Sequence, residues 1–221
     1  MRVPLKRILI TAGPTREKLD PVRYLSNEST GEMGYAIARE ARRRGSAVTL
    51  ITGPVALAAP AGVKIIRITS AAELEKACRI HFKRCDALFM TAAVCDFRPQ
   101  TLSRKKIKRA GSLHLRLEKT NDILAALARH KKGQTVIGFC LETQDWLVRA
   151  RRKIRNKRLD GIVANRLTAK RSPFGPVKTE VALLDGAASC RVLKRQPKTA
   201  VARRLLDWVE SLAGQKAVQK R

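Results

Sequence analysis

The residues best suited to chemistry in this 221-residue sequence follow its first apolar run, Arg7–Ala12. Gly13 ends that run, and the segment S-N-E-S-T-G-E-M-G follows at residues 26–34, where hydroxyls alternate with glycines. Because small residues let backbone N–H groups approach phosphate oxygens, this segment suits a phosphate cradle. The dinucleotide fingerprint G-x-G-x-x-G is absent. The segment fits an ordinary helix start as well, with Ser29 or Thr30 as the N-cap.

A second candidate is the group of small residues that ends a longer apolar run, Asp86–Val94. Ala92 and Ala93 precede Asp96, so space for a ligand would lie beside a carboxylate. Ligands of open α/β sheets bind at the carboxyl ends of strands, which is where this segment is expected. Pairing of Asp96 with Arg98, or a turn cap made by Asp96, explains the carboxylate equally well.

Two groups of cations could neutralise phosphate charge. The first surrounds Lys106 within 98–111, a flexible basic loop able to close over a triphosphate. The second lies on a basic helix expected at Trp146–Arg158, where Lys153 and Lys157 at i and i+4 share one face. A solvated surface, or nonspecific attraction to RNA, accounts for either group as simply.

Composition excludes several classes of protein. Lys plus Arg number 47 and Asp plus Glu number 18, and the net charge of +29 predicts polyanionic ligands. No G-x-S-x-G motif occurs and no histidine accompanies a candidate nucleophile, which disfavours Ser/His and Cys/His catalysis. Five cysteines without a C-x-x-C pair indicate reduced thiols in a cytoplasmic protein, with Cys95 and Cys140 expected to pack in the core. The three histidines form no metal-ligand spacing, and no apolar run approaches the roughly 20 residues that span a bilayer.

The elements that must position these residues alternate between apolar runs and amphipathic segments. Strands are expected at Arg7–Ala12, Ala47–Thr52, Lys64–Thr69, Asp86–Val94, Leu113–Leu117, Thr135–Leu141 and Gly161–Asn165, before a hairpin of Glu180–Asp185 and Cys190–Lys194. Helices are expected at Gly31–Arg44, Ser70–Lys83, Asp122–His130, Trp146–Arg158 and Pro197–Leu212. This alternation predicts an α/β fold with a doubly wound, mostly parallel, Rossmann-like sheet. We expect a single domain over residues 1–221, with a protruding basic arm and a C-terminal hairpin.

Several segments, taken in order, resemble the phosphopantothenate–cysteine ligase (phosphopantothenoylcysteine synthetase) family. They are D-P-V-R-Y-L-S-N with the following S-T-G-E-M-G, then A-A-V-C-D-F-R-P, K-K-I-K-R, D-I-L, G-F-C-L-E-T and K-x-x-x-K-x-x-D-x-I-V-A-N. The resemblance runs from about Lys6 to Asp185, and its first segment is highly specific. It implies a stand-alone bacterial ligase of coenzyme A biosynthesis. Such an enzyme joins 4′-phosphopantothenate to cysteine through an acyl-CMP intermediate, with CTP favoured over ATP and Mg²⁺ bridged by phosphates.

The resemblance also assigns roles to residues. Asn27 would contact the acyl group and Lys106 the triphosphate, while Arg23 would reach substrate across a homodimer interface. The pocket for phosphopantothenate and nucleotide would be lined by Ala92, Ala93 and Asp96. Phosphates would be held by Gly13, Ser29, Gly31 and Gly34. Base, ribose and phosphates would be held by Asn121, Asp122, Ile123, Leu124, Phe139, Lys153, Lys157 and Asn165. No metal ligand is implied, and a separate phosphopantothenoylcysteine decarboxylase is a candidate partner.

Three departures from the family pattern bear on nucleotide choice. Glu32 stands where the family has a cation, and Thr120-Asn121 stands where it has Asn-Pro. After Phe174-Gly175, the family's Ser, Asp and Asn are replaced by Pro176, Val177 and Thr179.

Two other functions compete with the ligase. One is a basic nucleic-acid-binding protein on the same fold, although 4% aromatic residues offer little stacking surface. The other is a nicotinamide or flavin oxidoreductase, which the missing fingerprint disfavours.

Overall fold

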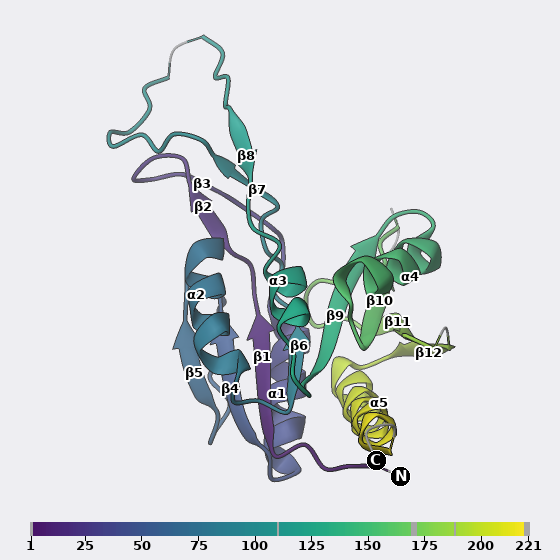
Figure 1. The fold of residues 1–221 in the computed structure, drawn as a ribbon. Helices are drawn as coiled ribbons and strands as arrows, with labels where there is room; N and C mark the ends of the chain where they lie inside the picture. Colours follow the sequence, from purple (N-terminus) through teal and green to yellow (C-terminus); the bar gives the residue numbers. More distant parts are fainter. Residues whose placement is uncertain (1, 110, 169–171, 188, 219–221) are drawn as a thin grey trace.

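An eight-stranded sheet forms the centre of the computed structural model, which describes residues 2–109, 111–168, 172–187 and 189–218 (Figure 1). Its order is β12-β11-β10-β9-β6-β1-β4-β5. The strands are β1 (Arg7–Ala12), β4 (Ala47–Thr52), β5 (Lys64–Arg67), β6 (Ala87–Met90), β9 (Thr135–Glu142), β10 (Gly161–Arg166), β11 (Thr179–Asp185) and β12 (Cys190–Gln196). All neighbours from β10 to β5 are parallel, and β11 and β12 form the antiparallel hairpin at one edge. The predicted mostly parallel α/β sheet is therefore confirmed.

Helices cover both faces of this sheet. On one face lie α1 (Glu32–Arg43) and α5 (Lys198–Val218), and on the other lie α2 (Ala71–Phe82), α3 (Ile123–Arg129) and α4 (Trp146–Lys157). Alternate residues of β1 point to opposite faces, so Ile8 and Ile10 pack against α1 and α5, whereas Leu9 packs on the side of α2. The fold is doubly wound, as predicted. Helix α5 continues past its predicted end at Leu212, because the following turn is still partly covered by the core.

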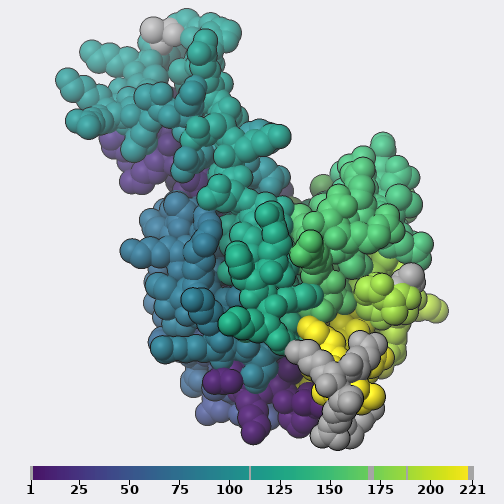
Figure 2. All heavy atoms as spheres, viewed as in Figure 1, coloured from purple at the N-terminus to yellow at the C-terminus, as the bar shows by residue number. Residues whose placement is uncertain are grey.

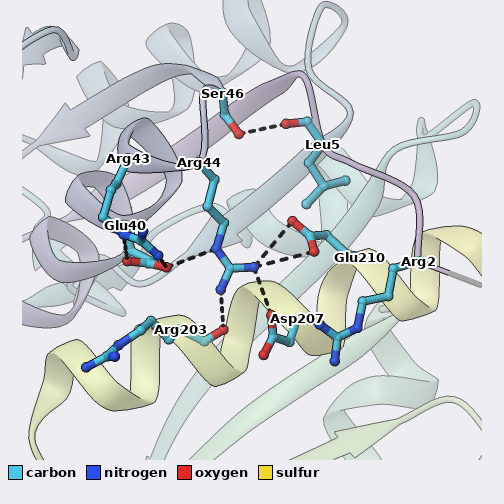
Figure 3. A network of polar contacts seen from close by, with 9 residues as sticks. All are labelled: Arg2, Leu5, Glu40, Arg43, Arg44, Ser46, Arg203, Asp207 and Glu210. Carbon is cyan, nitrogen blue, oxygen red and sulfur yellow. Dashed lines mark hydrogen bonds and ion pairs between the residues drawn. The ribbon is translucent and has the colours of Figure 1, made fainter.

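The far end of α1 is joined to α5 by a network of ion pairs (Figure 3). Arg44 Nε donates to Glu40 Oε1 at 2.9 Å, and its Nη1 lies 2.9 Å from Asp207 Oδ1 and 3.4 Å from Glu210 Oε2. Hydrogen bonds from Arg43, followed by those from Arg44, lower the pKa of Glu40 to about 2 against the opposing effect of burial. These contacts fix the two helices against one another.

A narrow arm projects from the body on the side where the parallel strands end (Figures 1 and 2). It is built on two short antiparallel pairs, β2 (Arg16–Lys18) with β3 (Tyr24–Ser26) and β7 (Phe97–Pro99) with β8 (Leu117–Lys119). The predicted protruding arm is confirmed, and the turn between β2 and β3 contributes to it as well.

A buried carboxylate, that of Asp20, joins the two halves of the arm. It accepts hydrogen bonds from the backbone N–H groups of Val22 and Arg23 at 2.8 Å and of Ile107 at 3.1 Å. Burial raises the pKa of Asp20, but these bonds and the Arg23 charge outweigh it, so the pKa lies below its ordinary value. The basic segment around Ile107 is thereby tied to the β2–β3 turn.

Two predicted strands differ from the observed ones. The strand expected at Asp86–Val94 ends at Met90, because Ala93 then bonds to the segment after β1, with its N–H 2.9 Å from the Gly13 carbonyl oxygen. The strand expected at Leu113–Leu117 is wrong for residues 113–116. The observed strand, β8, begins only at Leu117 and pairs with β7. Strands β2, β3 and β7 were not predicted, since three residues give no readable period.

Candidate functional site

A pocket of about 700 Å³ opens where β6, β9 and β10 end and where α1 and α3 begin. Figure 2 shows the surface hollowed on this side, between the base of the arm and α4. Strand ends and helix N-termini meet here because parallel strands all end at the same edge of the sheet, and the helices that follow them begin at that edge. Fifteen of the eighteen predicted site residues line this pocket: Asn27, Ser29, Gly31, Gly34, Ala92, Ala93, Asp96, Asn121, Asp122, Ile123, Leu124, Phe139, Lys153, Lys157 and Asn165.

The start of α1 has no side-chain cap. Gly31 is the N-cap residue, with φ +78°, and no side chain accepts from the first turn of the helix. The alternative interpretation, with Ser29 or Thr30 as the N-cap, is therefore wrong. Free N–H groups at a helix N-terminus attract anions, and here they border the pocket. Gly13 does not line the pocket but lies behind Gly31, where a Cβ on Gly31 would come within 3.2 Å of the Gly13 nitrogen.

Asn27 is brought to the wall formed by residues 91–96. Its Nδ2 lies 3.1 Å from the Ala93 carbonyl oxygen and 3.9 Å from Cys95 Sγ. Thr15 fixes both segments, since its carbonyl oxygen accepts from Ser26 Oγ at 2.8 Å and its hydroxyl accepts from the Cys95 N–H at 2.9 Å. The side-chain amide of Asn27 therefore makes two contacts at the pocket wall, and the contact with the Cys95 sulfur is the weaker one.

Asp96 keeps an exposed carboxylate in the pocket. The alternative pairing with Arg98 is wrong, because Arg98 Nε lies 2.7 Å from Glu118 Oε1 across the β7–β8 pair. Asp96 is thus held at the pocket wall by its backbone, whose carbonyl accepts from the Thr120 N–H at 3.0 Å.

The opposite wall carries two lysines of α4, both paired with carboxylates. Lys153 Nζ lies 2.6 Å from Glu142 Oε1, and Lys157 Nζ lies 2.8 Å from Asp122 Oδ2. Their shared face points into the pocket, as the i, i+4 spacing predicted. A phosphate bound here would replace these carboxylates as the partner of the two lysines.

At the departures, the side chains of Thr120 and Asn121 bond to neighbouring segments of the chain. Thr120 Oγ1 donates to the Cys95 carbonyl oxygen at 2.6 Å, and Asn121 Nδ2 donates to Glu75 Oε2 at 2.9 Å. This hydrogen bond from Asn121 is the largest of the effects that lower the pKa of Glu75. The turn before α3 is therefore held in place without the family's Asn-Pro.

Arg23 and Lys106 are not brought to the pocket of their own chain. Both lie on the arm, where Arg23 Nε pairs with Asp20 Oδ2 at 3.1 Å and its guanidinium donates to the Ile107 carbonyl. Lys106 is exposed on the same segment. The structure places these two predicted residues next to each other and apart from the other predicted site residues.

Lys198, the first residue of α5, lines the pocket and was missed by sequence reasoning. Its Nζ lies 2.7 Å from Glu32 Oε2, in the first turn of α1. Nothing in the local sequence distinguishes this lysine from the 46 other cations, because its partner is 166 residues away. Phe174, from the loop before β11, also borders the pocket and was not assigned to the site.

Four of the five cysteines are buried, and the fifth, Cys190, is exposed on β12 and does not line the pocket. Burial raises the pKa of Cys78 and Cys85 to about 12 and that of Cys140 to about 11, and it also raises the pKa of Cys95. The prediction that Cys95 and Cys140 pack in the interior is confirmed. Within the part of the chain that the structure describes, no group of three or more His, Cys, Asp or Glu side chains could hold a metal ion, and no helix is long and apolar enough to cross a membrane.

The chain matches a known family model and several curated relatives along most of its length. A family described as DNA/pantothenate metabolism flavoprotein C-terminal domain matches residues 4–212. The coenzyme A biosynthesis bifunctional protein CoaBC of Bacillus subtilis (strain 168) is 41% identical over 212 residues, which are 95% of this chain and 52% of that protein. The chain thus spans about half the length of the curated relatives it matches.

The fold is shared with solved structures, including the two that follow. The C-terminal domain of a CoaBC protein aligns with a TM-score of 0.82 and 37% identity, covering 95% of this chain and 96% of that one. A mutant of Cab2 in complex with phosphopantothenate-cysteine aligns with a TM-score of 0.80 over 97% and 88% of the two chains, and at 16% identity it bears on the fold alone. These matches favour neither the nucleic-acid-binding nor the oxidoreductase alternative.

Proposed function

This chain belongs to the family of the DNA/pantothenate metabolism flavoprotein C-terminal domain, as its resemblance to phosphopantothenate–cysteine ligases predicted, and from this premise we propose that it joins 4′-phosphopantothenate to cysteine. One observation carries the proposal. A single pocket combines an uncapped helix N-terminus, suited to phosphates, with an amide and a carboxylate from distant segments, Asn27 and Asp96. Such a site can position reactants and stabilise charge without a covalent nucleophile.

In the first proposed step, a carboxylate oxygen of phosphopantothenate attacks the α-phosphorus of CTP. The bond between the α-phosphorus and the bridging oxygen breaks, pyrophosphate leaves, and acyl-CMP forms. The free N–H groups of α1, with Ser29 and Gly34 beside them, would hold phosphate oxygens in line for this displacement. When bound to the nucleotide phosphates, Mg²⁺ would neutralise part of their charge.

In the second proposed step, the amine of cysteine attacks the acyl carbonyl carbon and expels CMP, while the nitrogen loses a proton. Negative charge develops on the carbonyl oxygen during this attack, and a nearby hydrogen-bond donor stabilises it. The Asn27 side-chain amide is that donor, exchanging its 3.9 Å contact with Cys95 Sγ for the oxyanion. Its bond to the Ala93 carbonyl, at 3.1 Å, would keep the amide oriented.

A homodimer formed through the arm would complete the site. Among the described residues, seven of the twelve exposed large hydrophobic side chains lie on the arm: Val22, Tyr24, Phe97, Leu102, Leu113, Leu115 and Leu117. Exposed apolar patches of this kind favour contact with a partner surface. Because Arg23 and Lys106 lie on the same arm, a second copy would receive both residues near its own pocket. The proposed setting is the cytoplasm, and the proposed partner is a phosphopantothenoylcysteine decarboxylase.

The proposal is tested by turnover of the purified chain. Protein, 4′-phosphopantothenate, cysteine and Mg²⁺ are mixed with CTP in one series and ATP in another. We expect phosphopantothenoylcysteine, with CMP and pyrophosphate in equal amounts, and faster turnover with CTP. Product formation only with ATP would overturn the nucleotide choice, and no product with either nucleotide would overturn the function. Salt-sensitive retention of RNA by an inactive protein would instead support the nucleic-acid-binding alternative.

A further inference from the structure

Every lysine that lines the pocket is paired with a carboxylate. Among the described residues these lysines are Lys153, Lys157 and Lys198. The first two belong to α4 and were assigned to the nucleotide by resemblance. Lys198 comes from α5, on the opposite face of the sheet, and its side chain is only 11% exposed. Its ammonium group therefore has few positions available to it.

The ammonium group of Lys198 is held at the start of α1. Nζ lies 2.7 Å from Glu32 Oε2 and also donates to the Gly175 carbonyl. The Gly175 N–H in turn donates to Thr30 Oγ1 at 3.3 Å, next to the Gly31 N-cap. An ammonium group has three donors, so one remains for a ligand in the pocket.

The stability of α5 does not account for a lysine at this position. Lys198 is the first residue of that helix, where a positive charge opposes the helix dipole, and no acidic residue stands in its first turn. Glu32, in contrast, has a favourable place in the first turn of α1. Residues that oppose the local preference of their helix are typical of functional sites.

We propose that Lys198 is an anion-binding residue of this pocket, whose ammonium group binds a phosphate oxygen of a substrate held at the start of α1. The inference rests on the proposed function and extends it to a residue on α5. Glu32 alone would repel a phosphate at this place, because its carboxylate lies beside the free N–H groups of α1. Lys198 cancels that charge and adds a donor. The phosphate belongs either to the nucleotide or to phosphopantothenate.

Two substitutions at the same ion pair separate binding from a structural role. In Lys198→Gln, the KM for the substrate whose phosphate is bound should rise by about 10- to 100-fold, as expected for loss of a charge-assisted hydrogen bond. In Glu32→Gln, the same KM should fall by about 2- to 5-fold, since a repelling charge is removed. Separate titrations of CTP and of 4′-phosphopantothenate identify which substrate carries the phosphate.

A purely structural pair gives a different result. Both variants lose the same 2.7 Å contact, so both would shift KM in one direction and lower thermal stability alike. That outcome, or an unchanged KM for both substrates in Lys198→Gln, overturns the proposal. If Lys198→Gln fails to fold, Glu32→Gln alone tests the proposal: a fall in KM supports it, and a rise in KM contradicts it.

Two controls keep this inference apart from the proposed function. Lys194→Met removes an equal charge from the exposed face of β12 and should leave both KM values unchanged. Calorimetric binding of CTP and of 4′-phosphopantothenate is measured without cysteine. If the wild-type chain forms no product, the proposed ligase function is contradicted. The proposal for Lys198 is tested separately by the binding affinities. Opposite changes of affinity in the two variants support it, and equal changes contradict it.

Discussion

Helices α1 and α5 are joined by ion pairs at both ends of α1, and the two junctions are built differently. At the far end, Arg44 follows the C-terminus of α1, where a cation suits the helix dipole, and it meets Glu40, Asp207 and Glu210 (Figure 3). At the pocket end, Glu32 meets Lys198, whose charge opposes the dipole of α5. The first junction therefore suits a role in stability, whereas we propose that the second presents polar groups to a ligand.

The largest effect is expected from Asn27→Asp at the pocket end. A carboxylate cannot donate to an oxyanion, so amide formation should slow by about 100- to 1000-fold. Release of pyrophosphate in the absence of cysteine should stay within about threefold of wild type, because Asn27 acts on the acyl carbonyl. Rapid-quench detection of accumulated acyl-nucleotide checks this expectation. An equal loss in both half-reactions would contradict the role given to Asn27.

Lys106→Gln tests whether the arm takes part in the first half-reaction. Loss of a cation that neutralises the triphosphate should slow pyrophosphate release by about 10- to 100-fold. The matched control is Lys105→Gln, its exposed neighbour on the same segment, which should have little effect. Pre-steady-state release of pyrophosphate is the measurement, and an unchanged rate in Lys106→Gln would remove this lysine from the site.

Arg44→Met tests the far junction. The change leaves Glu40, Asp207 and Glu210 without a shared partner, and we expect the free energy of unfolding to fall by about 2 kcal/mol. The KM and kcat values should stay within about twofold of wild type, since this network does not line the pocket. Urea unfolding and steady-state kinetics check both parts. A large change in KM would show that the two junctions are not independent.

The smallest effect is the dependence of the far junction on pH. The pKa of Glu40 is lowered from 4.5 to about 2, so its contribution to stability is fully present above about pH 4.5 and is lost as pH falls toward 2. Stability measured from pH 6 to pH 2.5 should therefore fall more steeply in wild type than in Glu40→Gln. Parallel curves would contradict the paired state of Glu40.

The sheet could be predicted because its strands are long apolar runs with short connections. β1 and β4 match their predicted ranges residue for residue, and α4 differs only at its last residue. The wall formed by residues 91–96 was mistaken for strand, because the small apolar residues of a pocket wall resemble a buried strand.

The site was only partly readable from sequence. Segments next to predicted strands and helices, such as those holding Asn27 and Lys153, could be placed at one edge of the sheet. The Glu32–Lys198 pair could not, because a contact across 166 residues leaves no local pattern. The left-handed Gly31 N-cap was hidden beside Ser29 and Thr30, which are themselves good capping residues.

The proposed reaction activates a carboxylate by attaching it to the α-phosphate of a nucleotide. 4′-Phosphopantothenate with both carboxylate oxygens labelled with ¹⁸O tests this directly, in a reaction with CTP, Mg²⁺ and cysteine. We expect CMP to carry one ¹⁸O atom, because the bridging oxygen leaves with the nucleotide when the amine attacks. Unlabelled CMP, or labelled inorganic phosphate together with a nucleoside diphosphate, would contradict it.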